Sequence, residues 1–356
     1  MKIGINTLQI ARNYGAVLQA YALKTYLEAM GHCVYMLNTR YQAKTLYKPK
    51  SFFYASIKEK ILYLKYFFNS FLPHYLPIFL RERNFDNFRR CYLDTAQLDF
   101  YDVIIYGSDQ IWSKWRNIGF DPFFWGWHHT ANRKIAFSAS MGMLDIENAD
   151  EKFIKDSLSH FSAISVREVD LQKELIKRNL APHLHIEHTI DPIFLLPKSY
   201  WEAFAPHRII REHYLLFYDF QIDEQTTIIA QTIAKQRHLR IVRLTDGIVS
   251  DGFDKYYRRT AGPREFLSLM KYADFVVSSS FHGTAFSVLL QKQFYVRQVW
   301  NKQRVKSLLE ICHLENRFID GVSQVSFEAL IDYSKVVPYL ESEIHRTQMF
   351  LQNAIY

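Results

Sequence analysis

The sequence predicts an α/β protein built from two doubly wound, Rossmann-like lobes that face a cleft. Apolar, strand-like segments alternate with helix-like segments, in two series separated near Asp191-Pro192. The length of 356 residues is about twice the ~150 residues of an ordinary domain. Hydrophobic residues make up 49% and charged residues 22%, which is typical of folded globular chains and excludes a disordered one.

The first series begins with a strand–helix–strand unit. Residues 2–8 predict a buried strand, the helical spacing of apolar residues after Asn13 predicts a helix that ends at Gly31, and 33–37 predict the next strand. Such a unit starts a parallel sheet with a helix on its face. Further strands are expected at 101–106, 134–137, 163–166 and near His185, with helices near 149–160 and from Glu168.

The second series has the same alternation. Strands are expected at 214–218, 240–244 and 274–277, and helices at 224–236, 264–272, 283–291 and 303–313. We therefore expect a first lobe over residues 1–195, with a helical aromatic and basic insertion at about 51–91, and a second lobe over 196–335. The remaining segment, 336–356, predicts a helix that packs back on the first lobe.

Charge and cysteine usage narrow the partners and the compartment. Lys and Arg outnumber Asp and Glu by 44 to 36, and the net charge of +8 favours anionic partners. Three widely spaced cysteines fit neither a disulfide framework nor a metal site, which favours a reducing compartment. The longest apolar stretch is too short to span a bilayer and no export signal is recognisable, so we expect a cytoplasmic protein.

The sharpest local feature follows the strand expected at 274–277. A serine-rich turn leads into His282 and Gly283 at the start of a helix. At such a position, free N–H groups and the helix dipole favour an anion, and glycine lets a ligand approach the backbone. A purely structural turn with a hydrogen-bonded His282 is the alternative.

Together with other short segments, this feature resembles the polysaccharide pyruvyl transferase family. The segments are 13–23, 106–112, 165–168, 191–192, 262–266, 279–287 and 307–309. The resemblance implies a GT-B-like fold, phosphoenolpyruvate as donor substrate without a cofactor, and a cyclic pyruvate ketal on a sugar diol as product. Such a reaction would serve surface or extracellular polysaccharide biosynthesis.

The resemblance also implies site residues. The family commonly has a donor-binding arginine where this chain has Arg167, and an Arg-x-His-Gly element where it has Ser280 to Gly283. Serine thus stands in place of the second arginine. The family-like segments also carry the other expected substrate-binding residues, which are Asn13, Gly15, Trp112, Ser280, Gly283 and Thr284.

The chemistry supports a small anionic donor. Residues 275–309 contain no Asp or Glu but five Lys or Arg, among them Arg304, which could replace the arginine missing at Ser280; a solvated basic helix face is the alternative. Ketal formation needs a proton donor and acceptor near neutral pH, which histidine provides, so His282 is the candidate catalytic residue.

The sugar acceptor has its own candidates. Asp109 follows a buried strand and could bind or deprotonate a sugar hydroxyl, unless it only caps a helix. Trp112 begins an aromatic loop whose rings could lie against sugar faces, unless they simply close over the core.

Other functions remain as alternatives. The same architecture suits a nucleotide-sugar glycosyltransferase, but the acid-free stretch offers no carboxylate for a ribose. Scattered basic residues and the absence of a known module make a nucleic-acid partner unexpected.

We expect no metal, because His183 and His185 lack a third ligand at a familiar spacing. The aromatic and basic insertion, with Lys58, Lys60 and Lys65, is compatible with peripheral contact to an anionic membrane at its inner face and with a lipid-linked acceptor. The alternative is an amphipathic helix pair packed on the first lobe with its basic face in water.

Overall fold

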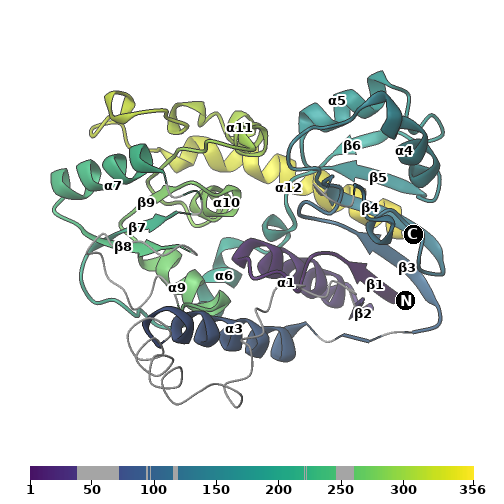
Figure 1. The fold of residues 1–356 in the computed structure, drawn as a ribbon, viewed down its shortest axis with the longest axis horizontal. Helices are drawn as coiled ribbons and strands as arrows, with labels where there is room; N and C mark the ends of the chain where they lie inside the picture. Colours follow the sequence, from purple (N-terminus) through teal and green to yellow (C-terminus); the bar gives the residue numbers. More distant parts are fainter. Residues whose placement is uncertain are drawn as a thin grey trace, which may run out of the picture.

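The computed structural model describes residues 1–37, 72–93, 95–96, 98–114, 119–219, 221, 223–245 and 260–356. Within these ranges the chain forms two parallel β-sheets with helices packed against them (Figure 1). The expected fold class, an α/β protein with two parallel-sheet lobes, is confirmed.

The first lobe contains a six-stranded sheet in the order β2-β1-β3-β4-β5-β6. Its strands are β1 (Lys2–Asn6), β2 (Cys33–Met36), β3 (Tyr101–Tyr106), β4 (Ala131–Ala139), β5 (Ala163–Val166) and β6 (Ile186–His188). Its helices are α1 (Tyr14–Ala29), α3 (Leu72–Tyr92), α4 (Glu151–Leu158) and α5 (Val169–Lys177). The part of the expected insertion over 51–71, including Lys58, Lys60 and Lys65, lies outside the described residues.

The second lobe contains a four-stranded sheet in the order β10-β9-β7-β8. Its strands are β7 (Tyr214–Tyr218), β8 (Arg240–Leu244), β9 (Phe275–Ser278) and β10 (Phe294–Val296). Its helices are α6 (Lys198–Phe204), α7 (Glu224–Gln236), α9 (Pro263–Tyr272), α10 (Phe281–Leu289) and α11 (Lys302–Ile311), followed by α12 (Tyr333–Ile355). Strand β10 was not predicted from the sequence, because three residues are too few to show a periodicity.

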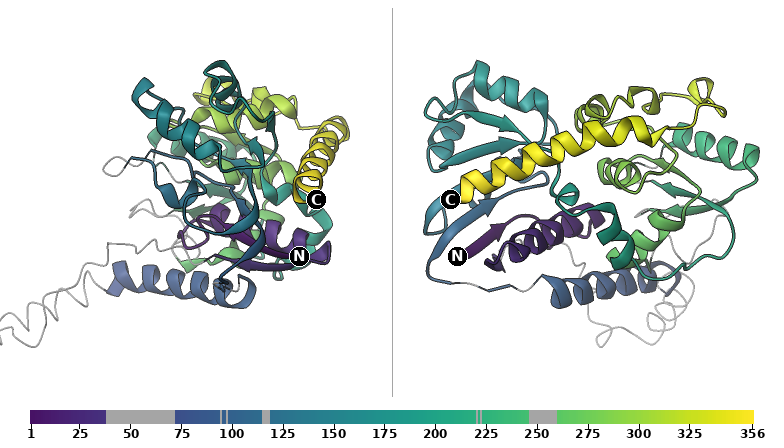
Figure 2. Two further views of the ribbon diagram at one scale, coloured as in Figure 1. Left: turned by 90° about the vertical axis from the view of Figure 1, so that its right-hand side faces the viewer. Right: turned by 180° about the vertical axis from the view of Figure 1, so that it is seen from behind.

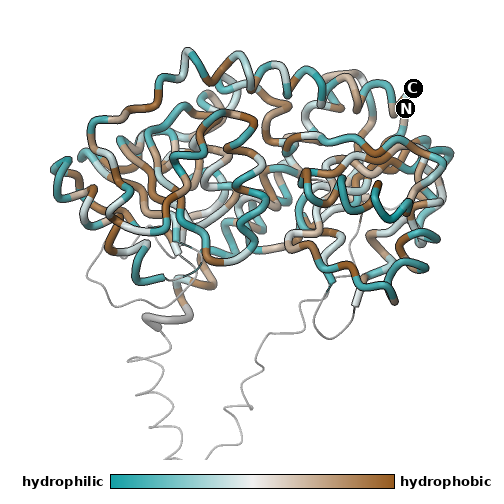
Figure 3. The backbone as a smooth tube through the Cα atoms, turned by 90° about the horizontal axis from the view of Figure 1, so that it is seen from above, coloured by the Kyte–Doolittle hydropathy of each residue, from teal (hydrophilic) through white to brown (hydrophobic). Residues whose placement is uncertain are grey.

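Apolar strands buried on both faces explain why parallel sheets form. All residues of β7 and β9 are buried, and β1 is buried except at its first residue. The hydropathy colouring shows the same pattern, with hydrophobic segments running through the interior of both lobes (Figure 3).

A single hydrophobic core connects the two lobes. It contains Ile5 of β1 and Leu216 of β7 together with Val17 of α1. At the start of α1, Tyr14 stacks on Phe266 of α9 at 4.7 Å and donates a hydrogen bond to the carbonyl of Ala261 at 2.7 Å. The N-terminus of α1 is therefore fixed against the second lobe.

Helix α12 links the lobes on the opposite side. It begins beside the second lobe and crosses to the first, as the view from behind shows (Figure 2). There Phe350 stacks on Phe137 of β4 at 6.2 Å, and Thr347 accepts a hydrogen bond from the backbone N–H of Ile190 at 3.2 Å. Because Ile190 lies just after β6, α12 holds the chain segment that follows this strand.

Buried His188 of β6 is part of the same connection. Its Nε2 lies 3.1 Å from the carbonyl oxygen of Arg167, and its Nδ1 lies 3.2 Å from Nη2 of Arg346 on α12. Both contacts are satisfied when Nε2 carries the only ring proton and Nδ1 accepts from the guanidinium. Burial, helped by the charge of Arg346, lowers the pKa of His188 to about 4.

We predict that His188 makes the fold sensitive to mild acid. Its pKa is lowered from 6.5 to about 4 on folding, so the unfolded chain binds a proton more readily. The stability due to neutral His188 is therefore complete above pH 6.5 and falls as the pH drops toward 4, by at most about 1.4 kcal/mol per unit. His188→Gln should flatten this slope, measured by urea unfolding between pH 4 and 7.5. Exposed His185→Gln should keep the wild-type slope, and an unchanged slope in His188→Gln would contradict the prediction.

Candidate active site

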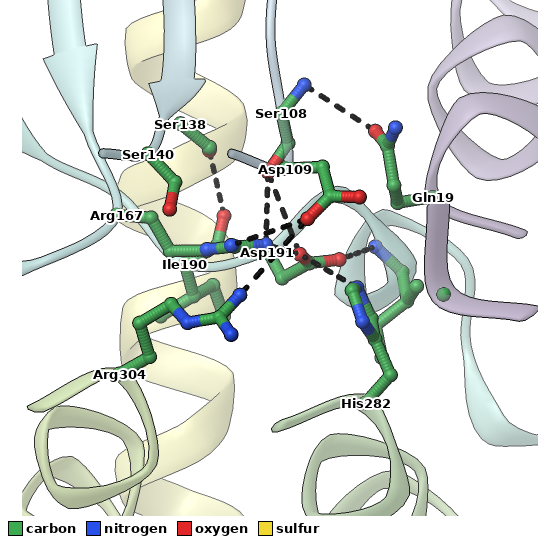
Figure 4. Close-up of polar contacts among 12 residues, drawn as sticks. Gln19, Ser108, Asp109, Ser138, Ser140, Arg167, Ile190, Asp191, His282 and Arg304 are labelled. Carbon is green, nitrogen blue, oxygen red and sulfur yellow. Dashed lines mark hydrogen bonds and ion pairs between the residues drawn. The ribbon is translucent and has the colours of Figure 1, made fainter. Parts of the chain in front are cut away.

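A cluster of charged side chains lies where the two lobes meet (Figure 4). Asp109, Arg167 and Asp191 follow the carboxyl ends of β3, β5 and β6 in the first lobe. His282 of α10 and Arg304 of α11 reach them from the second lobe. Each of the five is at most 7% exposed, so the cluster is almost closed to solvent. The structure thus brings together four residues expected from the sequence, and adds Asp191.

Arg167 is the centre of the cluster. Its Nη1 donates to Oδ2 of Asp191 at 2.5 Å and to the hydroxyl of Ser108 at 3.3 Å. Its Nε lies 3.6 Å from Glu168, and its Nη2 lies 3.8 Å from Asp109. Burial alone would lower the pKa of Arg167, but these carboxylates outweigh it and raise the pKa. Among the described residues, neither Nε nor Nη2 has a hydrogen-bond partner, so both can donate to a ligand.

Asp191 connects Arg167 to His282. Its Oδ2 accepts from Arg167 and lies 3.4 Å from Nε2 of His282, while Oδ1 accepts from the backbone N–H of Ile193 at 3.1 Å. Burial would raise the pKa of Asp191, but His282, Arg167 and this backbone N–H outweigh it and hold the pKa well below its usual range. An ionised Asp191 can orient the imidazole through Nε2, which leaves Nδ1 free for a substrate.

Gly15 makes room for that imidazole. A Cβ at this position would lie 1.9 Å from Nδ1 and 2.0 Å from Cγ of His282. Asn13 caps α1, because its Oδ1 accepts from the backbone N–H groups of Gly15 at 2.9 Å and Ala16 at 3.4 Å. The two residues expected to bind substrate therefore place the first turn of α1 against His282.

Arg304 brings a second guanidinium to the site. Its Nη1 lies 4.0 Å from Oδ1 of Asp109. With the side-chain amide of Gln110 turned so that its oxygen faces Arg304, this oxygen accepts hydrogen bonds from Nη2 at 2.8 Å and from Nη1 at 3.0 Å. Burial and the nearby charge of Arg167 lower the pKa of Arg304 to about 10. Its Nε has no hydrogen-bond partner in the described part of the chain. Asp109 thus lies between two arginines from opposite lobes.

Three residues around His282 have roles within the second lobe. Ser280 precedes α10, and its carbonyl accepts from the hydroxyl of fully buried Thr284 at 3.0 Å. A Cβ at Gly283 would lie 2.1 Å from Oγ of Ser278 and 2.6 Å from the ring of Tyr218. Gly283 and Thr284 therefore fit α10 closely against its sheet. Full burial of the Thr284 side chain corrects the expectation that it binds substrate, whereas substrate binding through the backbone of Gly283 stays a prediction.

Trp112 does not reach the site either. Its side chain is fully buried, stacks on Trp125 at 4.6 Å and donates from Nε1 to the carbonyl of Phe124 at 3.2 Å. The predicted sugar-stacking role is therefore corrected, because this part of the aromatic loop closes over the first-lobe core. Trp115 lies outside the described residues.

The sequence analysis assigned no role to three residues that the structure places here. Asp191 and Glu168 each follow a strand, and a carboxylate at a strand end is a signal that could have indicated them. Glu168 accepts from the hydroxyl of Ser140 at 2.5 Å, and burial raises its pKa. Phe281 lies against both arginines, a contact that no local pattern predicts.

Other candidate sites contribute little. Among the described residues, no group of three or more His, Cys, Asp or Glu could hold a metal ion. The described helices include none long and apolar enough to cross a membrane. A pocket of about 370 Å³ lies between the ends of α11 and α12, lined in part by Cys312, Arg317 and Tyr339, and contains no residue of the charged cluster.

Comparisons with solved structures give distant likenesses. A functionally uncharacterised protein from Klebsiella pneumoniae subsp. pneumoniae is 12% identical with a TM-score of 0.41, over 69% of this chain and 87% of that one. UDP-GlcNAc 2-epimerase from Neisseria meningitidis is 8% identical with a TM-score of 0.43, over 99% and 94%. ADP-heptose LPS heptosyltransferase II from E. coli is 10% identical with a TM-score of 0.31, over 98% and 100%.

A family model gives the informative match, since none of the curated proteins is significantly similar. The model of the polysaccharide pyruvyl transferases matches residues 13–297, which is most of the chain. The matched range contains Asp109, Arg167, Asp191 and His282 and ends shortly before Arg304. With most of its length and four of its five clustered site residues inside that match, the chain belongs to the polysaccharide pyruvyl transferase family.

Proposed function

We propose that the protein transfers pyruvate from phosphoenolpyruvate to two hydroxyls of a sugar, forming a cyclic ketal during the synthesis of a surface or extracellular polysaccharide. The observation that carries the proposal is the pair of buried guanidiniums, Arg167 and Arg304, beside His282 at the junction of the lobes. The pair suits a small substrate with two anionic groups, and the histidine suits a reaction that moves protons.

The two arginines would bind the donor. Phosphoenolpyruvate carries a carboxylate and a phosphate on the same carbon, C2, and guanidinium N–H groups match the oxygens of both. Arg167 has free donors at Nε and Nη2, and Arg304 has one at Nε, among the described residues. Arg304 would supply the positive charge that the family places at position 280, where this chain has serine.

His282 would move the protons. It gives a proton to the methylene carbon of the donor, which leaves a cationic centre at C2, and the first sugar hydroxyl attacks C2 and returns its proton to the imidazole. Phosphate then leaves C2, and the second hydroxyl closes the ring while its proton goes to the phosphate. Asp191 would orient the imidazole through Nε2, at 3.4 Å, so that Nδ1 faces the substrate.

Asp109 would act on the acceptor. Before the donor binds, Asp109 lies 3.8 Å from Arg167 and 4.0 Å from Arg304, so its charge is shared between them. Donor oxygens that bind these guanidiniums would take over both contacts. The freed carboxylate would then accept a hydrogen bond from a sugar hydroxyl, whose proton passes to the imidazole or to the phosphate as described above.

The proposal also includes the acceptor, the compartment, the absence of a cofactor and a contact with the membrane. The acceptor would be a glycan or a lipid-linked saccharide, the protein would work in the cytoplasm, and no cofactor would take part. Peripheral contact with an anionic membrane is proposed through the insertion at about 51–91, of which residues 51–71 lie outside the described residues.

A direct assay tests the function. The protein is incubated with phosphoenolpyruvate and a panel of model and lipid-linked glycosides, and with nucleotide sugars in a parallel arm. We expect phosphate release only from phosphoenolpyruvate, and a ketal methyl signal in the NMR spectrum of the product. His282→Ala should keep its unfolding midpoint and lose about two to four orders of magnitude in turnover. Sugar transfer from a nucleotide sugar without ketal formation would contradict the proposed pyruvyl transfer and show that the protein is a glycosyltransferase.

Gly15→Ala should disable His282 without touching a substrate-binding side chain. The new methyl group would lie 1.9 Å from Nδ1, so the imidazole must move away from its place beside Asp191. We expect a fall in kcat of at least about 100-fold, comparable to the loss of a positioned acid or base. Gly321→Ala is the matched control, because nothing lies within 4 Å of its Cβ. Equal kcat values in the two variants would contradict the role of Gly15.

Arg304→Lys tests the replacement of the missing arginine. Lysine keeps the charge but loses the planar fork, so we expect KM for phosphoenolpyruvate to rise about 10- to 100-fold with a smaller change in KM for the acceptor. Arg317→Lys is the control, since Arg317 is also a buried arginine of the second lobe but lies outside the cluster. If both variants change donor KM equally, Arg304 has no specific role at the donor.

A further inference from the structure

Phe281 is the common neighbour of three groups in the proposed active site. It is the first residue of α10 and is 4% exposed. The guanidinium carbon of Arg167 lies 4.5 Å from its ring centroid, and that of Arg304 lies 5.5 Å away. The imidazole of His282 meets the ring edge to face, with centroids 5.1 Å apart and an interplanar angle of 80°.

An aromatic ring can hold two guanidiniums close together and leave their N–H donors free for a substrate. Two guanidiniums close together repel each other, and the charge of Arg167 helps burial to lower the pKa of Arg304. Carboxylates also offset this repulsion, as Asp109 and Asp191 do here, but a carboxylate that accepts a hydrogen bond takes up an N–H group that an anionic substrate needs. The face of an aromatic ring attracts cations without accepting ordinary hydrogen bonds, so the donors stay free.

The unpaired donors of the cluster agree with this arrangement. Nε and Nη2 of Arg167 and Nε of Arg304 are buried and have no hydrogen-bond partner among the described residues, although both guanidiniums lie against Phe281. The ring belongs to the second lobe, as does Arg304, whereas Arg167 belongs to the first. One side chain therefore contacts guanidiniums that come from different lobes.

We propose that Phe281 is a positioning residue for the donor: its ring holds Arg167 and Arg304 at the spacing that binds the two anionic groups of one phosphoenolpyruvate molecule. This inference rests on the proposed function, because it assigns the arginine pair to that donor. It adds a residue whose contribution is made through the arginines and not through contact with the reacting atoms.

The test varies the electrostatics of the ring at nearly constant shape. Phe281 is replaced by phenylalanine analogues with one, two and three ring fluorines, which progressively weaken the attraction of the ring for cations. We expect both KM and the directly measured Kd for phosphoenolpyruvate to rise with each fluorine, to about tenfold in total, with a smaller change in kcat and an unchanged unfolding midpoint. A ring that only fills space would give no such trend.

Phe281→Leu and a matched variant complete the design. Phe281→Leu removes the ring and should raise the same KM by about tenfold or more. Phe275→Leu removes another buried ring that holds an arginine, Arg237 at 5.1 Å, at the opposite end of β9 from the site, and should leave KM unchanged.

The outcomes separate the inference from the function on which it rests. If wild-type protein binds phosphoenolpyruvate but the fluorinated variants bind it equally well, the role of Phe281 is overturned and the proposed function stands. If wild-type protein neither binds nor consumes phosphoenolpyruvate, both are overturned. A rise in Kd that follows fluorination supports both.

Discussion

The carboxylate of Asp191 is the interaction on which the arrangement of the site depends. One oxygen, Oδ2, accepts from Arg167 at 2.5 Å and lies 3.4 Å from His282, so it connects a strand end of the first lobe to a helix start of the second. Its other oxygen caps the turn that follows, through Ile193. A buried carboxylate is costly unless its charge is compensated, so Asp191, Arg167 and His282 stabilise one another's positions.

The surrounding fold holds this carboxylate from two sides. On one side, Thr347 of α12 bonds the backbone of Ile190 next to it, and His188 joins the backbone of Arg167 to Arg346 of the same helix. On the other side, α1 is fixed against the second lobe by Tyr14, and Gly15 leaves space for the imidazole. The lobes thus share a hydrophobic core in addition to the charged cluster, and the core sets the distance over which the charges meet.

Local patterns were sufficient for the fold and for part of the site. The strand and helix rhythm predicts both sheets, because strands buried on both faces are continuous apolar runs, and only the three-residue β10 escapes this signal. Asp109 and His282 were indicated because each stands at the end of a strand or the start of a helix, whereas Arg167 was indicated by the resemblance to the family. The role of Gly15 could not be predicted, because it depends on a contact with a residue 267 positions later in the chain. Trp112 and Thr284 show the opposite error, since a family-like segment also contains residues that only pack.

Under the proposed function, Ser280 shows how a site would keep its charge while it changes a residue. The backbone at position 280 starts α10, and an arginine there would project from the same turn that carries His282. In this chain the second guanidinium comes from Arg304 of α11 and lies over Phe281, the next residue after the serine. A binding site requires a positive charge at a place and not at a sequence position, so a neighbouring helix can supply it when its side chain reaches the same ring. The aromatic residue at 281 is then as much a part of the substitution as the arginine, because it provides the surface on which the relocated guanidinium rests without using its N–H donors.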